Sequence, residues 1–167
     1  MERIQGIHHI TAVAGDPQRN VNFYHEVLGQ RLIKRTVNFD DPGTYHLYYA
    51  DKIGTPGTNL TFFPWKHMKR GRRGNGEVVA IGYAIPTNSV GFWRDRLAKF
   101  GVNVTEETVF DQPVLKFEDP DGMWLELYPT SDPSTIEFWE KGPVSEDHAL
   151  RGFYNATMWV NQTARSE

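Results

Sequence analysis

Two consecutive histidines near the N-terminus, His8 and His9, are the residues best suited to chemistry in this sequence. They lie in the run IQGIHHITAVA, residues 4–14, whose isoleucine, threonine and valine content predicts a β-strand. Adjacent side chains of a strand point to opposite faces, so we expect one imidazole to face a site and the other to face away. A neutral imidazole is a common ligand of iron and zinc, and a hydrogen-bonded core position is the other interpretation.

A carboxylate in a second strand-like run is the other candidate ligand. Glu126 lies between Leu125 and Leu127 in the run WLELYP. A buried carboxylate is costly unless it is paired or bound to a metal, which favours a ligand if Glu126 faces the interior. If the two leucines face the interior instead, Glu126 is an exposed strand residue. The spacing leaves both interpretations open.

The elements that would position these residues occur twice, each time as a strand, a helix and three more strands. Alternating or helical apolar patterns, separated by glycine- and proline-rich turns, predict each element. In the first copy they are a strand at 4–14, a helix at 17–29 and strands at 31–38, 44–50 and 58–63. In the second copy they are a strand at 78–85, a helix at 89–100 and strands at 102–109, 113–118 and 124–129. The sequence predicts an α+β fold of two βαβββ modules, which we expect to pair into a cleft whose ligands come from their first and last strands.

The chain is predicted to contain five segments. They are a first module (1–65), a basic glycine-rich linker (66–76), a second module (77–130), a connector (131–150) and the start of a third module (151–167). The linker lacks the spacing of a phosphate-binding loop, so a solvated linker is the preferred interpretation. The last segment begins with RGFYNATMWV, which repeats the pattern of the opening strand. An unpaired strand of this kind predicts strand exchange or a homodimer, and we expect the chain to be a fragment or a shortened gene product.

Positions equivalent to the two candidate ligands hold no strong metal ligand in the other copies. Thr61 stands where the second module has Glu126, and Ala80 stands where the first module has His9. Tyr154 takes that place in the third opening strand. The chain therefore supplies at most two strong ligands, whereas a facial triad of two histidines and one carboxylate needs three.

Composition excludes several other classes of function. The chain has 167 residues, no cysteine, a formal net charge of -3 and a pI near 6.1. Without cysteine there are no thiolate metal sites and no cysteine nucleophiles. The charge gives no electrostatic reason to expect nucleic acid or an anionic membrane as a partner. The N-terminal residues show neither a signal peptide nor a transmembrane run, so we expect a cytoplasmic protein.

Several motifs resemble the ring-cleaving dioxygenases of the vicinal-oxygen-chelate superfamily, in particular the N-terminal half of the hydroquinone-type enzymes. They are GIHHITAVAGDPQRNVNFY, KRTVNFDDPGTYHLYYADKIGTPGTNLTFFPW, FEDPDGMWLELY and EDHALRGFY. The resemblance implies Fe(II)-dependent extradiol cleavage of a hydroquinone- or catechol-like diol by O₂, with Mn(II) or another divalent metal as an alternative. It also implies a metal ligand at His9 and residues that approach the substrate or oxygen at His8 and Thr11.

The resemblance treats the carboxylate of the second module differently. Glu126 matches the last-strand carboxylate of the wider superfamily, whereas the other histidine and the glutamate of the dioxygenase site belong to a fourth module. Four aromatic side chains could wall an apolar pocket for the substrate, and packing in the core explains them as well: Tyr45, Tyr48, Phe62 and Phe63.

Two alternatives stay open. One is a glyoxalase-type, metal-dependent lyase or isomerase, in which a homodimer brings His9 and Glu126 of two chains together. The other is a non-enzymatic module of the same fold that binds a small molecule.

Overall fold

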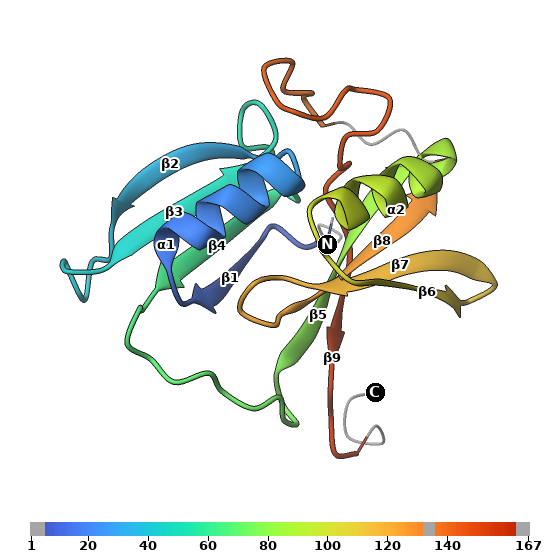
Figure 1. Cartoon of the computed structure of the whole chain (residues 1–167). Helices are drawn as coiled ribbons and strands as arrows, with labels where there is room; N and C mark the ends of the chain where they lie inside the picture. The colour runs from blue at the N-terminus through green and yellow to red at the C-terminus, as the bar shows by residue number, and fades with distance from the viewer. Residues whose placement is uncertain (1–5, 132–135, 163–167) are drawn as a thin grey trace, which may run out of the picture.

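The computed structural model describes residues 6–131 and 136–162, and Figure 1 shows the arrangement of their elements. The first module contains β1 (His9–Ala14), α1 (Pro17–Val21), η1 (Asn22–Val27), β2 (Arg31–Val37), β3 (Tyr45–Ala50) and β4 (Asn59–Pro64). The second contains β5 (Val78–Pro86), η2 (Thr87–Ser89), α2 (Val90–Lys99), β6 (Val104–Val109), β7 (Gln112–Glu118) and β8 (Trp124–Thr130), and β9 (Phe153–Met158) follows. The α+β class and the repeated βαβββ order are confirmed.

Each module forms its own sheet. The first sheet has the strand order β1-β4-β3-β2, and the second has the order β6-β7-β8-β5-β9. In both modules the first strand runs parallel to the last, β1 beside β4 and β5 beside β8. Thr11 lies opposite Thr61 in the first pair, and Gly82 lies opposite Glu126 in the second. This register makes Thr61 equivalent to Glu126 and places Ala80 at the position that corresponds to His9.

The first helix differs from the α-helix that the pattern predicts. It begins as α1, where Asp16 accepts a hydrogen bond from the Arg19 backbone N–H at 2.9 Å. It continues as the π-helix η1, in which the Leu28 N–H donates to the Phe23 carbonyl, five residues earlier, at 3.1 Å. The second helix, α2, is α-helical over ten residues. The glycine after each helix, Gly29 or Gly101, has a φ of +72°, which ends the helix at little steric cost.

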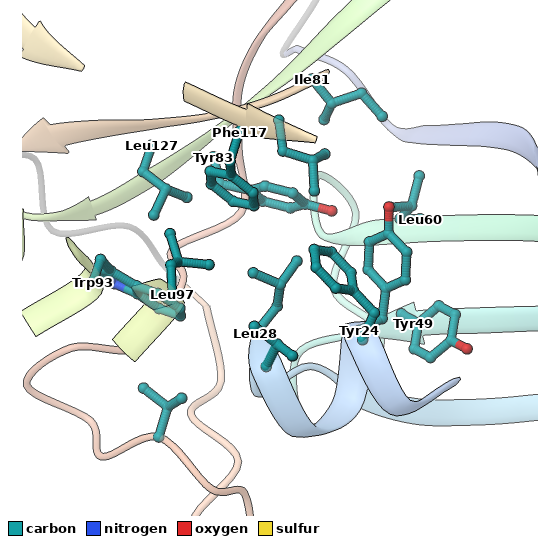
Figure 2. Packing of buried hydrophobic residues seen from close by; sticks show 14 of the residues in the cluster. Tyr24, Leu28, Tyr49, Leu60, Ile81, Tyr83, Trp93, Leu97, Phe117 and Leu127 are labelled. Atoms are coloured by element: carbon teal, nitrogen blue, oxygen red, sulfur yellow. The ribbon is translucent and has the colours of Figure 1, made fainter. Parts of the chain in front are cut away.

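The two modules pack against each other through the faces of their sheets that carry the helices (Figure 2). Equivalent aromatic residues, Tyr24 in η1 and Trp93 in α2, are fully buried in this common core. Its other members include Leu28, Tyr49, Leu60, Phe62, Ile81, Tyr83, Leu97, Phe117, Leu125 and Leu127.

Among residues 6–131 and 136–162, the faces that carry His9 and Glu126 do not come together in one cleft. Leu60 and Phe62 of β4 face the common core, and so do Leu125 and Leu127 of β8. Side chains alternate along a strand, so the intervening residue of each strand lies on the outer face of its sheet, the face away from the helices. Burying both apolar faces against each other removes the most hydrocarbon surface from water, and it turns the two outer faces away from one another.

Strand β9 pairs antiparallel with the free edge of β5, with Gly82 opposite Asn155. The expectation of an unpaired strand is therefore wrong, and the argument for strand exchange that rested on it is lost. A bulge between these strands lets Tyr154 and Asn155 both reach the outer face, where Tyr154 stacks on Tyr128 at 4.4 Å between ring centroids. In the first sheet, β1 occupies the edge and has only β4 as a neighbour among residues 6–131 and 136–162.

Part of the basic linker is docked rather than solvated. Arg73 donates to Glu118 at 2.7 Å, and its guanidinium lies 3.9 Å from the ring centroid of Trp124. Parts of the predicted connector and third module, at 132–135 and 163–167, lie outside the described residues. Within the described ranges, no helix has the length and apolar character needed to span a membrane.

Candidate functional site

The outer face of the first sheet gathers the polar residues of three neighbouring strands. His9 and Thr11 come from β1, Thr61 from β4, and His46 and Tyr48 from β3. Alternation in each strand sends these side chains away from the common core. We call this set the histidine face.

His8 and His9 lie together, contrary to the expectation that they point to opposite faces. Their rings are perpendicular with centroids 5.3 Å apart, and their Nδ1 atoms are 3.1 Å apart. The physical reason is that β1 begins at His9, so His8 lies before the strand and its direction is not set by the pleat. Both side chains are exposed. The arrangement offers two imidazoles to one region of solvent, with one Nδ1 acting as donor and the other as acceptor.

A chain of hydrogen bonds crosses the histidine face from β3 to β1. The hydroxyl of Tyr48 lies 2.9 Å from Nδ1 of His46. The opposite ring nitrogen, Nε2, lies 3.1 Å from Oγ1 of Thr61, which lies 3.0 Å from Oγ1 of Thr11. Thr11, a predicted site residue, is therefore connected to a histidine that the sequence reading did not choose. The alternation in TYHLYY, with tyrosine and histidine two residues apart, was the available signal.

The His46 ring is fixed between two aromatic rings. Its centroid lies 4.1 Å from that of Tyr48 and 4.0 Å from that of Phe63. Burial lowers the pKa of His46 below its ordinary value of 6.5, and the positive charge of Lys34 lowers it further. His46 is thus a neutral imidazole at pH 7, with one nitrogen that donates and one that accepts.

The aromatic residues expected to wall a pocket divide between two environments. Phe62 is fully buried in the common core, where Tyr24 packs on it at 4.7 Å between ring centroids. Tyr48 and Phe63 lie on the histidine face beside His46. Tyr45 is 47% exposed, and alternation along β3 places it on the helix side. Only two of the four aromatic residues therefore adjoin the candidate site.

Glu126 occupies a different sheet and a different environment. It is only 7% exposed, although it lies on the outer face of the second sheet. The Tyr128 hydroxyl donates to its carboxylate at 2.9 Å, and the ammonium of Lys116 lies 3.8 Å away. The adjoining strand β5 presents only small residues here, Ala80 and Gly82. This carboxylate is paired with Tyr128 and Lys116 of its own module, in a different sheet from His9 and Thr11.

The described part of the chain does not complete a metal site. Among residues 6–131 and 136–162, no group of three or more histidines, aspartates or glutamates is arranged to hold an ion. The donor set fits a single ligand position at His9, and a facial triad needs two more groups.

Two βαβββ modules that share one core, each with its first strand parallel to its last, define the class of fold. Residues 6–127 match the Glyoxalase/Bleomycin resistance protein/Dioxygenase superfamily. The chain belongs to this superfamily.

Curated relatives in this superfamily are ring-cleaving enzymes by name. The chain is 45% identical over 161 residues to MhqO of Bacillus subtilis (strain 168), which carries the name of a ring-cleaving dioxygenase, and covers 51% of its length. It is 37% identical over 165 residues to the chlorohydroquinone/hydroquinone 1,2-dioxygenase of Sphingobium indicum and again covers 51%. The alignments span 96% of this chain in both cases, so the chain spans about half the length of these relatives.

Solved structures support the same fold. A crystal structure of a protein described as a dioxygenase from Bacillus subtilis superposes with a TM-score of 0.90 at 43% identity, covering 99% of this chain and 53% of that one. FosX, a fosfomycin resistance protein of Listeria monocytogenes solved with Mn(II) and sulfate, gives a TM-score of 0.56 at 16% identity. This match covers 77% of this chain and 95% of the FosX chain, and at this identity it shows only that the two share a fold.

Proposed function

We propose that this chain supplies one wall of the active site of a metal-dependent ring-cleaving dioxygenase that acts on a hydroquinone- or catechol-like diol and O₂. The observation that carries the proposal is the histidine face, on which His9 and Thr11 project from the first strand beside His8. The named activities of relatives at 37–45% identity support the reaction class. Fe(II) is the proposed metal, with Mn(II) or another divalent ion as the alternative.

His9 is the proposed metal ligand. When its Nδ1–H donates to Nδ1 of His8, 3.1 Å away, its Nε2 lone pair is free to bind a metal. A hydrogen bond to the non-ligating nitrogen fixes the tautomer and the orientation of a ligating histidine. His8 then orients the ligand and presents its own Nε2–H near the bound diol, where it can donate a hydrogen bond or a proton.

The remaining ligands are proposed to come from a strand placed beside β1. The second sheet provides the precedent, because β5 has β8 on one side and β9 on the other. The corresponding edge of β1, next to His9, has no strand beside it among residues 6–131 and 136–162. A strand added there would lie directly beside His9, at the inter-strand spacing of about 4.8 Å. A complete triad therefore requires a segment beyond the described residues, or a second chain.

The chain's own residues would bind and orient the substrate. The metal, when bound, provides a Lewis acid that orients a diolate and oxygen and polarises both. Thr11 lies two residues from His9 on the same face, roughly 6.6 Å along the strand, and can hydrogen-bond an oxygen of the bound molecule. Phe63 and Tyr48 add apolar ring surface next to it. A cytoplasmic location and a homodimer stay predictions.

The test is anaerobic titration with Fe(II) of the protein in an assembly that places a further strand beside β1, followed by metal analysis and by oxygen uptake with methylhydroquinone. We expect His9→Ala to weaken iron binding at least about a hundredfold, because even residues that only support ligands contribute 10- to 100-fold. His67→Ala is the matched control, since His67 is an exposed linker residue. Equal iron binding by His9→Ala and the unchanged protein would show that the ligand assignment is wrong.

Glu126→Gln separates this proposal from the glyoxalase-type alternative. In the alternative, Glu126 of one chain and His9 of another hold the metal together, so the variant loses iron. In the dioxygenase proposal the variant keeps iron, because Lys116 and Tyr128 already pair the carboxylate within its own module. Metal content measured on both variants at equal protein concentration decides between the two.

A further inference from the structure

The hydrogen-bond chain of the histidine face has two directions in which the proton of the buried Thr61 hydroxyl has an acceptor among the described residues. A threonine hydroxyl carries one proton, so it donates one hydrogen bond and accepts others. If Tyr48 donates to Nδ1 of His46, then Nε2–H donates to Thr61. The buried Thr61 proton then has only Thr11 as an acceptor among the described residues, and leaving it unpaired would be costly, so Thr61 donates to Thr11. If the direction is reversed, Thr11 donates to Thr61 and offers only a lone pair to anything that binds above the sheet.

The surroundings favour the first direction. A phenol O–H is a good donor, and a neutral imidazole nitrogen is a good acceptor. The ammonium of Lys34 lies 5.2 Å from the centroid of the Tyr48 ring, and its positive charge strengthens the phenol as a donor while opposing a second proton on His46. The stack of the imidazole between Tyr48 and Phe63 keeps both ring nitrogens in line with their partners.

We propose that Tyr48 and His46 are positioning residues that hold the Thr11 hydroxyl as a hydrogen-bond donor directed away from the sheet, toward an oxygen anion bound beside His9. The inference rests on the proposed function, which places such an anion there. Thr61 donates its hydroxyl proton to Thr11, so Thr11 can donate its own proton to the bound molecule. Thr11 is exposed on this face, which leaves that direction open.

A fixed donor at this place selects for charged oxygen. Hydrogen bonds to an ionised acceptor are shorter and about twice as strong as those between neutral groups. A donor that is already oriented needs no reorganisation when a phenolate or reduced oxygen arrives. The face thus favours the deprotonated diol over the neutral diol, because Tyr48 and His46 orient the Thr11 hydroxyl by way of Thr61.

The direct test is the tautomer of His46, measured by long-range ¹H–¹⁵N correlation spectra of the chain at pH 7.5 without metal or substrate. The signals are assigned by their loss in His46→Gln. We expect Nε2 to be protonated and Nδ1 to show the shift of an unprotonated, hydrogen-bonded nitrogen. A ring protonated at Nδ1, whether neutral or cationic, would overturn the proposal.

Tyr48→Phe tests the origin of the direction while keeping the aromatic stack. We expect its His46 signals to move toward a mixture of the two tautomers, because Nδ1 has lost its donor. Tyr45→Phe is the matched control on the same strand, since Tyr45 lies on the helix side, and it should leave the His46 tautomer unchanged. An unchanged tautomer in Tyr48→Phe would show that Tyr48 does not set the direction.

A second readout separates this inference from the proposed function. In protein loaded with Fe(II), Tyr48→Phe should lower kcat for methylhydroquinone about three- to tenfold, the usual effect of one hydrogen bond, and change KM by less than about twofold. A rise in KM with no change in kcat would contradict a role in orienting Thr11. If iron does not bind at all, the proposed function fails, while the tautomer of His46 in the metal-free chain still decides the direction of the hydrogen bonds.

Discussion

The first and second modules share a fold and a strand register, but the outer faces of their sheets carry different residues. Where the first has His9, Thr11 and Thr61, the second has Ala80, Gly82 and Glu126. On the first face His9 and Thr11 are exposed to solvent, whereas Thr61 is buried, with 3% of its surface exposed. On the second, Tyr128, Tyr154 and Asn155 cover the small residues of β5.

The two sheets also differ in how the first strand of each module is flanked. Strand β5 is flanked by β8 and β9, whereas β1 is flanked by β4 alone among residues 6–131 and 136–162. In the second sheet, β9 pairs with β5 and the outer face is covered. In the first sheet, β1 has a neighbour on one side only among the described residues, and the outer face carries the histidines. The second face is thus covered by residues of its own module and by β9, whereas His9 and Thr11 of the first face and the edge of β1 stay accessible among the described residues.

The largest expected effect comes from the core that the modules share. Trp93→Ala and Tyr24→Ala remove equivalent, fully buried rings, and each should lower the free energy of unfolding by about 3–5 kcal/mol. Because both rings lie in one core, each variant should still unfold in a single transition, with circular dichroism and fluorescence curves that coincide. Phe39→Ala is the control, since Phe39 is 96% exposed, and it should change stability by less than about 0.5 kcal/mol. Two separate transitions would mean that the modules fold independently.

A smaller loss of stability is expected when the residue type of Thr11 on the first face is introduced at Gly82, the equivalent position of the second face. In Gly82→Thr, the new Cβ would lie 2.3 Å from Oδ1 of Asn155 and 2.8 Å from Cε2 of Tyr128. We expect a loss of about 1–3 kcal/mol in urea unfolding, because these side chains must move. Gly71→Ala is the control, since nothing lies within 4 Å of its added Cβ. A neutral Gly82→Thr would mean that the second face is as accessible as the first.

The smallest expected change in stability concerns two equivalent aspartates, each of which follows the third strand of its module. They are Asp51 after β3 and Asp119 after β7. Burial would raise the pKa of Asp51, but hydrogen bonds from Thr55, Gly54 and Glu137 outweigh it and hold the pKa below 3.8. Burial raises the pKa of Asp119 above 3.8, despite its bonds from Met123 and Tyr24. The two carboxylates should therefore respond to pH in opposite directions.

Asp51 contributes stability above its ordinary pKa and loses it as the pH falls through the depressed folded-state value. Asp51→Asn should cost about 1–2 kcal/mol at pH 7, and the difference from the unchanged protein should shrink below pH 4. For Asp119 the sign is reversed, because its contribution grows as the pH falls through a raised folded-state pKa. Asp119→Asn should cost less than about 1 kcal/mol at pH 7, measured by urea unfolding between pH 3 and 7. Equal costs at pH 7 would contradict the different environments of the two turns.

Much of the fold could be read from local patterns. The glycines that end the helices, the turns DDPG and DPDG, and the alternation of apolar residues placed nearly every strand within two residues of its observed bounds. The π-helical turn of η1 was not predictable, because it has the same apolar spacing as an α-helix over one turn and depends on packing against the second module.

The candidate site was predictable only in part. His9 and Thr11 could be chosen from one strand, because their spacing places them on the same face. His46 could not, because its role depends on β3 lying two strands away from β1 in the sheet, with β4 and Thr61 between them. The contact of His8 with His9 depends on the residue at which the strand begins, which propensity does not define.

The sequence by itself determined the two βαβββ repeats, the equivalence of His9 with Ala80 and of Thr61 with Glu126, and the absence of thiolate chemistry, since these follow from residue type and spacing. Only the tertiary structure decided which faces of the sheets meet. An alternating strand specifies that one face is apolar, but it does not specify the partner that buries it. In this protein the two helix-bearing faces bury each other, so the histidine of one module and the glutamate of the other lie on separate outer faces.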